Sequence, residues 1–339
     1  MPDLLSPLPL HGLTLRNRIV MPPMWSGQAT PEGHVTASIV EYHRRRAGAG
    51  CGLVIVEHAF VHGRGRHSAT QIGVHNDTTI EGLSRLAHAI RNEGAAACLQ
   101  LAHAGSRSSS RVLGSRPLAP SALRHPYEPE GDVPEAMSGH TFAEVIRAFG
   151  DAAERARAAG FQAVEVHAAH GFLLGQFLSP LTNRRTDEYG GLLENRCRLH
   201  LAVLAEVLSR VDADCPVFVR LGVHDETPGG LELEDACQAA RWLTAEGAAL
   251  IDVSGGHQGS RGVGKGAAYF VPYAKALKAV ITEPVMVAGG IVEADLADRI
   301  VREGWADLVG VGRAMLNDPD WAAKAIAHLS MTRAAGDQK

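Results

Sequence analysis

The stretch Phe142–His167 reads FAEVIRAFGDAAERARAAGFQAVEVH and joins a helix to a strand through one glycine. Its first part, Phe142–Ala159, has the apolar period of an amphipathic helix. Gly160 follows directly, as glycine does where a helix ends in a left-handed residue. The apolar run Ala163–His167 then lacks strict alternation, which is typical of a parallel strand buried on both faces. The stretch is therefore predicted to be one helix-strand unit of a parallel sheet.

The same unit recurs along the chain, with glycine after five of the helical segments, at Gly50, Gly94, Gly160, Gly247 and Gly304. The predicted strands are Arg18–Met21, Leu53–Glu57, Ala97–Leu101, Ala163–His167, Val217–Leu221, Leu250–Ser254, Val285–Ala288 and Leu308–Val311. The predicted helices between them are Ser38–Ala49, Thr79–Glu93, Phe142–Ala159, Leu193–Ser209, Leu233–Glu246, Val271–Val280 and Ala294–Glu303. Eight such units predict a (β/α)8 TIM barrel, with residues 1–339 forming a single domain. The sequence after Ala327 carries no core pattern.

Composition excludes several classes of protein. The 339 residues are 45% hydrophobic and 21% charged, as in an ordinary globular protein, and the formal net charge is −4. That balance argues against a nucleic-acid binder or a polybasic membrane arm. The first ten residues do not have the pattern of a signal peptide, and no apolar run reaches about 18 residues. The five scattered cysteines fit reduced thiols. We therefore expect a cytoplasmic protein that binds no membrane.

Polar residues follow the predicted strands, at the barrel end where function is expected. The segment 106–138, rich in Ser, Pro and Arg, follows the third strand and is predicted to be a long loop over this active face. Gly289-Gly290 and Gly312-Arg313 follow the seventh and eighth strands, where barrels commonly bind phosphate. Glycine backbone N–H groups can approach an anion closely, and arginine adds a charged partner. The alternative is plain turn glycines beside a surface arginine.

His167 and His170 form an H-x-x-H pair at the end of the fourth strand. Such a pair can bind a metal, but no third ligand offers itself, so we predict no metal site. Two imidazoles on an active-face loop better suit hydrogen bonds to a substrate oxygen or an anion.

The run from His167 to Arg196, HAAHGFLLGQFLSPLTNRRTDEYGGLLENR, closely resembles the Old Yellow Enzyme family of FMN-dependent oxidoreductases. Four further segments agree in order: Leu15–Met24, Leu99–Gly105, Val219–Gly222 and Ala306–Pro319. The resemblance covers nearly the whole chain and is greatest to the branch that includes 2,4-dienoyl-CoA reductase and trimethylamine dehydrogenase. Those relatives continue into an iron–sulfur motif and two nucleotide domains, whereas this sequence resembles their barrel alone.

The resemblance implies an FMN site across the barrel mouth and an NADPH or NADH electron donor. Gly289, Gly290, Gly312 and Arg313 would bind the FMN phosphate. Gln100 would bind the pyrimidine edge of the ring, and Arg220 would stabilise the negative charge of reduced flavin. Pro23 and Met24 would line the ring. His167 and His170 would hold the carbonyl oxygen of a small-molecule substrate and so polarise a conjugated C=C bond.

Three positions depart from the family pattern. Phe172 stands where ene-reductases usually carry a proton-donating tyrosine, so water or another group, such as His257, would have to supply the proton. His58 replaces a small residue beside the flavin, and Trp25 stands where many relatives carry Cys or Thr. Trp25 and His58 would border both flavin and substrate, and Phe172 would border the substrate, which would give the pocket an unusual wall. The alternative for Trp25 is a packing residue at the barrel rim.

Three functions remain open. The leading hypothesis is NAD(P)H-dependent reduction of a carbonyl-conjugated C=C bond. The alternative is FMN-dependent oxidation of an amine or N-methyl group, or desaturation of a ring, which needs no tyrosine proton donor. The third is a barrel that binds a phosphorylated ligand without redox chemistry. Barrels of this family often pair, so a homo-oligomer is also expected.

Overall fold

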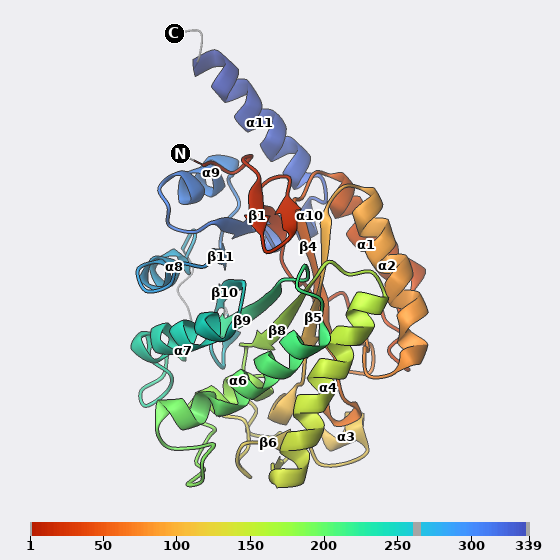
Figure 1. The fold of residues 1–339 in the computed structure, drawn as a ribbon, viewed down its shortest axis with the longest axis vertical. Helices are drawn as coiled ribbons and strands as arrows, with labels where there is room; N and C mark the ends of the chain where they lie inside the picture. Colours follow the sequence, from red (N-terminus) through yellow and green to blue (C-terminus); the bar gives the residue numbers. More distant parts are fainter. Residues whose placement is uncertain (1, 260–265, 337–339) are drawn as a thin grey trace.

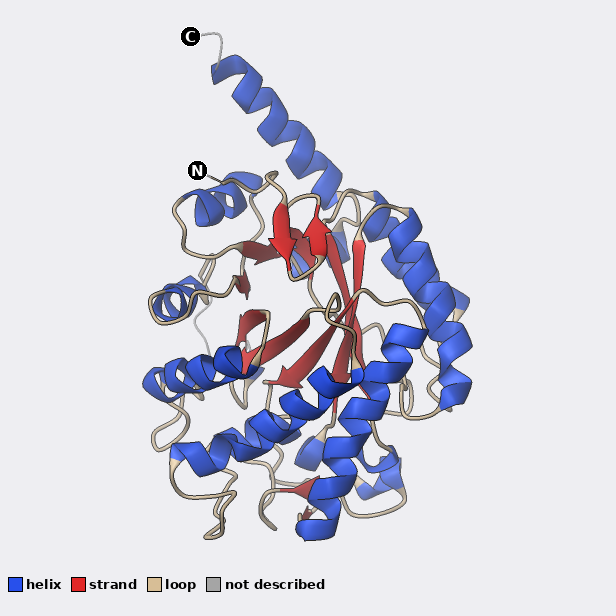
Figure 2. Ribbon diagram, viewed as in Figure 1, coloured by secondary structure: helices blue, strands red, loops and turns tan. Residues whose placement is uncertain are grey.

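The eight predicted strands close into one parallel barrel, which confirms the (β/α)8 fold. The computed structural model describes residues 2–259 and 266–336. Within them, the strands hydrogen-bond in the circular order β10-β11-β12-β3-β4-β5-β8-β9. Helices surround these strands on the outside (Figures 1 and 2). The barrel strands are β3 (Ile19–Met21), β4 (Leu53–Phe60), β5 (Ala96–Ala102), β8 (Ala163–Ala168), β9 (Val217–Gly222), β10 (Leu250–Ser254), β11 (Val285–Ala288) and β12 (Leu308–Gly310).

All seven predicted helices form, and the five predicted glycine caps have φ between +65° and +121°. The outer helices are α1 (Ala37–Gly48), α2 (Ile80–Asn92), α4 (Gly139–Ala158), α6 (Leu193–Arg210), α7 (Leu233–Glu246), α8 (Val271–Lys278) and α9 (Ala294–Arg302). Helix α4 begins three residues before its predicted start at Phe142. The reason is a cap: the Ser138 N–H donates to Thr141 Oγ1 at 2.8 Å and satisfies a group that the helix leaves free.

The barrel interior is apolar at one end and polar at the other. Inward side chains such as Val20, Cys98, Phe218 and Met286 form one buried cluster. The hairpin of β1 (Leu8–Leu10) and β2 (Leu13–Leu15) packs into that cluster and covers the end where the strands begin. Polar residues follow toward the other end, so the strand ends after β3, β9, β10, β11 and β12 are left to form a site.

The predicted active-face loop, 106–138, contains short elements. They are α3 (Ser110–Leu113), β6 (Leu118–Ala119) and β7 (Glu135–Ala136), of which the two strands pair in parallel. The segment contacts the chain that follows β9 and β10, since Tyr127 bonds Thr227 and His125 bonds His257. It therefore packs on the carboxyl face of the barrel beside α5 (Leu173–Leu178).

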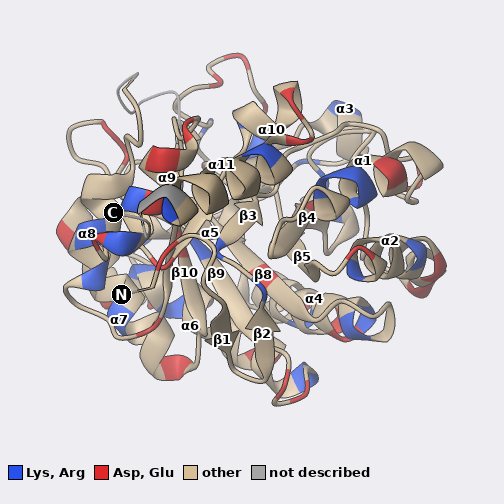
Figure 3. Cartoon of the chain, turned by 90° about the horizontal axis from the view of Figure 1, so that it is seen from above, with Lys and Arg blue, Asp and Glu red and all other residues tan. Residues whose placement is uncertain are grey.

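A helix that the sequence pattern did not predict follows α10 (Arg313–Asn317). Helix α11 (Trp321–Gly336) packs through Trp321, Ala322, Ala325 and Leu329 and then projects from the barrel (Figure 1). Its outer part has no apolar face, which is why the hydrophobic period gave no signal there. Seen from above, basic and acidic segments alternate around the helices (Figure 3). In the described part of the chain, we find no helix with the length and hydropathy needed to cross a bilayer.

Candidate functional site

A cavity of about 300 Å³ opens where the barrel strands end. Its lining comes from the carboxyl ends of β9, β10 and β11 and from the chain that follows β3, β8, β10, β11 and β12. Eight of the predicted site residues line it: Pro23, Met24, His170, Arg220, Gly289, Gly290, Gly312 and Arg313. The predicted residues that do not line it are Trp25, His58, Gln100, His167, Phe172 and His257, and each is placed below.

One end of the cavity is a glycine cradle. A Cβ on Gly290 would lie 2.5 Å from the Gly266 carbonyl oxygen, and one on Gly289 would lie 2.6 Å from the Tyr269 ring. A Cβ on Gly312 would lie 2.9 Å from the Met24 sulfur. Side chains at these positions would therefore collide with neighbouring protein atoms, so the backbone lines the cavity bare and its N–H groups can face an anion.

Arg313 supplies the charge beside this cradle. Its Nη2 donates to the Tyr269 hydroxyl at 3.2 Å, and the guanidinium is otherwise open to the cavity. Tyr269 was not among the predicted residues, because it lies in a loop whose position depends on packing against Gly289 and Gly290. The cradle and Arg313 together fit a phosphate group.

Arg220, Ser254 and His170 form a hydrogen-bonded chain along the cavity wall. Arg220 Nη2 donates to Ser254 Oγ at 3.4 Å, and Ser254 Oγ lies 2.6 Å from His170 Nε2. The serine oxygen accepts from the arginine, and its own proton can point at Nε2. In that arrangement the His170 proton lies on Nδ1, where it can donate. His170 has φ +58°, and its backbone N–H donates to the Gly255 carbonyl, which holds the residue in place.

Arg220 also faces two buried acids. Its Nε is 3.1 Å from Asp252 Oδ2, and Asp252 is fully buried. Gln100 donates from Nε2 to Glu165 Oε1 at 2.7 Å, so its amide group is fixed by an acid inside the barrel. Burial raises the pKa of Glu165 to about 8, with Asp252 adding to the rise and Arg220 opposing it. Burial likewise raises the pKa of Asp252, against the pull of Arg220.

A cluster of aromatic and imidazole rings adjoins the cavity. The ring centroid of His167 lies 5.0 Å from that of His170 and 4.9 Å from that of Phe172. Phe172 in turn lies 5.3 Å from His58 and 5.4 Å from His67. Nδ1 of His167 and Nε2 of His58 are buried and have no hydrogen-bond partner among the residues that the structure describes. The structure thus brings His58, His167, His170 and Phe172 together, as a surface that can bind a polar group.

Trp25 and His67 form the outer edge of this cluster. Trp25 is 52% exposed, and its ring lies 6.3 Å from that of His67. Trp25 therefore lies at the exposed rim and does not form a wall of the cavity. His67 was missed by the sequence reasoning because it follows β4 in a loop, and its Nδ1 donates to the Arg107 carbonyl at 2.8 Å.

The histidines of the cluster are neutral. Burial lowers the pKa of His58 to about 3 and holds the pKa values of His167 and His170 well below the ordinary value, with nearby Arg220 adding to each effect. A neutral imidazole can donate one hydrogen bond and accept another, so these groups can bind an oxygen without bringing a charge.

Buried neutral histidines make stability depend on pH, and His103 tests this. Burial lowers its pKa from 6.5 to about 3, so between these values the unfolded chain binds the proton and the folded chain does not. The contribution of His103 to the free energy of unfolding is therefore complete above pH 6.5 and is lost as pH falls. The loss from this residue is about 2 kcal/mol at about pH 5. Asn can keep an acceptor for the Gly105 N–H that now bonds His103 Nδ1. Between about pH 7 and pH 5, we expect the free energy of unfolding in urea to fall less for His103→Asn than for wild type. An equal fall in the two proteins would contradict this expectation.

His257 lies apart from the cavity, and the structure does not support the predicted role of proton donor for it. Its Nε2 bonds Thr182 Oγ1 at 3.1 Å and its Nδ1 lies 3.2 Å from His125 Nε2, so both nitrogens have partners. The side chain is buried, and its backbone N–H donates to Asp225 Oδ1 at 2.9 Å. The sequence alone could not indicate this pairing, because His125 lies 132 residues away from His257, in the active-face segment that covers it.

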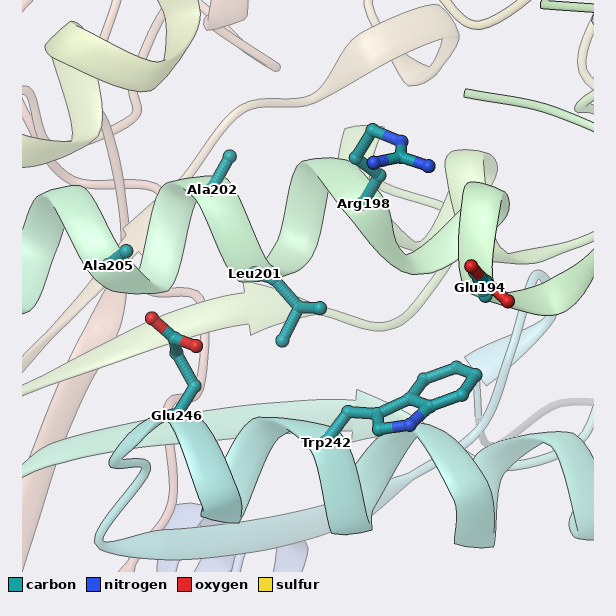
Figure 4. A pocket seen from close by; sticks show the side chains of 7 residues that line it. All are labelled: Glu194, Arg198, Leu201, Ala202, Ala205, Trp242 and Glu246. Atoms are coloured by element: carbon teal, nitrogen blue, oxygen red, sulfur yellow. The ribbon is translucent and has the colours of Figure 1, made fainter. Parts of the chain in front are cut away.

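A second hollow, of about 670 Å³, lies on the outer surface between α6 and α7 (Figure 4). Its apolar floor comes from Leu201, Ala202 and Ala205 of α6 and from Trp242 of α7. All its lining residues lie on these two helices, so it is separate from the strand ends. Its charged residues are Glu194, Arg198 and Glu246, and it carries no buried polar group that could do chemistry.

Comparison with known proteins identifies the family of this chain. The model of the NADH:flavin oxidoreductase / NADH oxidase family matches residues 3–331. An NADPH dehydrogenase of Bacillus subtilis is 35% identical over 328 residues, which cover 96% of this chain and 95% of the relative. An NADH oxidase of Thermoanaerobacter brockii is 37% identical over 331 residues, 96% of this chain but 50% of the relative. The chain thus spans about half the length of some relatives that it matches.

Solved structures give the same result. An Old Yellow Enzyme homologue from Zymomonas mobilis superposes with a TM-score of 0.83 at 28% identity, covering 94% of this chain and 91% of that chain. The closed barrel, the cradle and the buried arginine define a (β/α)8 barrel protein with a cavity at the carboxyl ends of its strands. The chain belongs to the NADH:flavin oxidoreductase / NADH oxidase family, and the predicted resemblance to Old Yellow Enzyme is confirmed.

Proposed function

We propose that this chain binds FMN and uses NADPH or NADH to reduce a C=C bond conjugated to a carbonyl group in a small molecule. The observation that carries the proposal is the neutral pair His167 and His170 beside a cavity that ends in a phosphate cradle. Both imidazoles can donate to one carbonyl oxygen, and the contact of His170 Nε2 with the Ser254 hydroxyl at 2.6 Å leaves Nδ1 able to donate. The NADPH dehydrogenase and NADH oxidase names of the relatives support the nicotinamide donor.

The residues present fit FMN. The cradle at Gly289, Gly290 and Gly312 keeps its shape only while these positions lack side chains, because a Cβ there would collide with the protein around it, and Arg313 supplies the countercharge. Pro23 and Met24 line the cavity between the cradle and His170. When bound, FMN would supply the hydride that the β-carbon of the alkene accepts. Gln100 and Arg220 would bind the polar edge of the ring, and the positive charge of Arg220 favours electron-rich flavin.

The chain's own residues then act on the substrate. His167 and His170 bind the carbonyl oxygen and stabilise the negative charge that develops there. Phe172 closes the adjacent wall, and its phenyl ring has no proton that it could donate. The proton for the α-carbon must therefore come from water at the open rim near Trp25. The β-carbon would thus receive a hydride and the α-carbon a proton from solvent. We therefore expect alkene reduction in D2O to place deuterium at the α-carbon.

A second candidate function rests on Phe172. Phe172 has no ionisable group where a tyrosine would donate a proton. Oxidation of an amine or N-methyl group, or desaturation of a ring, needs no such donor, so phenylalanine at this position would not impair these reactions. The two candidates differ in electron donor. Anaerobic assays of NADPH consumption with an enone, and of flavin bleaching with amines, separate them.

Arg313 is expected to contribute to FMN retention. We expect Arg313→Ala to raise the Kd for FMN by about tenfold, the loss of one charge-assisted contact of about 1.5 kcal/mol. Arg313→Lys, which keeps the charge but not the fork of donors, is expected to lose less. Isothermal titration of FMN into apo-protein measures both. Arg302→Ala, on an exposed residue of α9, serves as the control. Full retention in Arg313→Ala would remove Arg313 from the phosphate site.

A further inference from the structure

Two carboxylates inside the barrel have fewer hydrogen bonds than they can accept. Glu165 on β8 and Asp252 on β10 are both 0% exposed. Glu165 Oε1 accepts from Gln100, whereas among the described residues no donor hydrogen-bonds Glu165 Oε2 or either oxygen of Asp252, whose only close partner there is the ion pair with Arg220. Burying a full charge with so few partners is costly, so the free energy favours neutralising one of the two acids.

Arg220 is the cation that both acids share. It stands between them on β9, paired in register with Asp252 on β10 and with His167 on β8, and its Nε lies 3.1 Å from Asp252 Oδ2. Because Arg220 also lines the cavity, any charge next to it acts on what the cavity holds. The acids do not line the cavity, so they would act through Arg220.

The other titratable groups of the barrel strands do not change this balance. The strand sequences contain only Glu57, His58, Cys98 and His167 besides these three groups, and β3, β11 and β12 contain none. Cys98 faces both acids and remains a neutral thiol, because burial raises its pKa and the two acids add to the rise. His58 and His167 are neutral, and Glu57 faces Ser26 and His43 instead.

We propose that Glu165 and Asp252 are positioning residues that hold one proton between them and thereby set how much positive charge Arg220 presents to bound flavin. The proposal rests on the FMN function argued above. Asp252, in direct contact with Arg220, is the ionised member, and Glu165 is the protonated one. With one proton the three groups have no net charge, and ionisation of both acids makes the net charge −1.

The consequence concerns the reduced flavin. Addition of a hydride delivers two electrons and one proton, so the flavin gains one negative charge. A more positive surrounding therefore binds the reduced form more tightly than the oxidised form and raises the midpoint potential. The negative charge on the acids reduces this effect of Arg220 on the midpoint potential.

The test is the midpoint potential of the FMN-loaded protein, measured by equilibrium reduction between about pH 6.5 and pH 9. Asp252→Asn removes the ionised acid, and we expect it to favour the reduced form about tenfold, a rise of about 30 mV for a two-electron couple. Glu165→Gln is expected to match wild type at neutral pH. Above about pH 8, where Glu165 ionises, the wild-type potential should fall below that of Glu165→Gln. Glu57→Gln, a buried strand acid away from Arg220, is the matched control and should follow wild type.

A second readout needs no flavin. The folded chain holds a proton on Glu165 at pH values where the unfolded chain does not, so the contribution of Glu165 to the stability of apo-protein falls as pH rises toward 8. The buried histidines are common to both proteins, so the stability of wild type relative to Glu165→Gln should fall between about pH 6 and pH 8. Unchanged potentials in both variants, with FMN bound, would overturn the proposal, as would a parallel pH profile of apo stability. Failure of wild type to bind FMN would instead overturn the proposed function and leave the apo profile to decide the acid pair.

Discussion

Replacing His170 with alanine is expected to lower kcat/KM for an enone by about 10²–10³-fold, the effect of removing one donor from a developing oxyanion. His170 lines the cavity and is held as a donor by Ser254, so its loss leaves the substrate oxygen with His167 alone. Reduction of the flavin by NADPH needs no carbonyl contact and should change much less. Stopped-flow measurement of the two half-reactions separates these effects.

Two further variants sharpen this prediction. Ser254→Ala keeps the imidazole but removes the group that fixes its tautomer, so we expect a smaller loss, of about tenfold. His224→Ala removes a histidine after β9 that pairs with Glu226 and Glu232 outside the cavity, and it should leave both half-reactions unchanged. Equal loss in both half-reactions of His170→Ala would mean that this histidine also serves the nicotinamide or the fold.

Replacing Gly290 with alanine is expected to weaken FMN binding by roughly ten- to a hundredfold, from an overpacking cost of about 1–3 kcal/mol. The new Cβ would lie 2.5 Å from the Gly266 carbonyl oxygen and 3.0 Å from the Tyr269 ring, so the cradle must shift. Titration of FMN into the apo variant measures the loss.

Gly304 provides the matched control for this variant. Its φ is +65° against +68° for Gly290, but a Cβ there meets open space. Gly304→Ala therefore carries the same left-handed backbone strain, about 1 kcal/mol of stability, without filling the cradle. It should bind FMN as wild type does. Equal FMN affinity in the two variants would show that Gly290 does not border the phosphate.

The barrel was predictable because each unit repeats the same local signals. A helical period, a glycine with positive φ and a short apolar run are all local in the sequence, and each is decided by neighbouring residues. The cavity residues Arg220 and Gly289 could be placed for the same reason, since a residue at the carboxyl end of a parallel strand must lie at the barrel mouth.

What could not be predicted depends on contacts between distant segments. His257 was expected near the substrate, but His125 from the active-face segment pairs with it and fixes it elsewhere. Tyr269 reaches the cradle only because its loop folds over Gly289. The acids Glu165 and Asp252 did leave a signal, a charged residue in the middle of an apolar strand, and it was overlooked.

The decisive experiment is anaerobic mixing of the FMN-loaded protein with NADPH, followed by an enone. We expect NADPH to bleach the flavin absorbance and the enone to restore it, with the saturated ketone as product. A flavin that ignores NADPH and NADH but is bleached by an amine or a saturated ring would contradict alkene reduction and establish the reverse, oxidative direction.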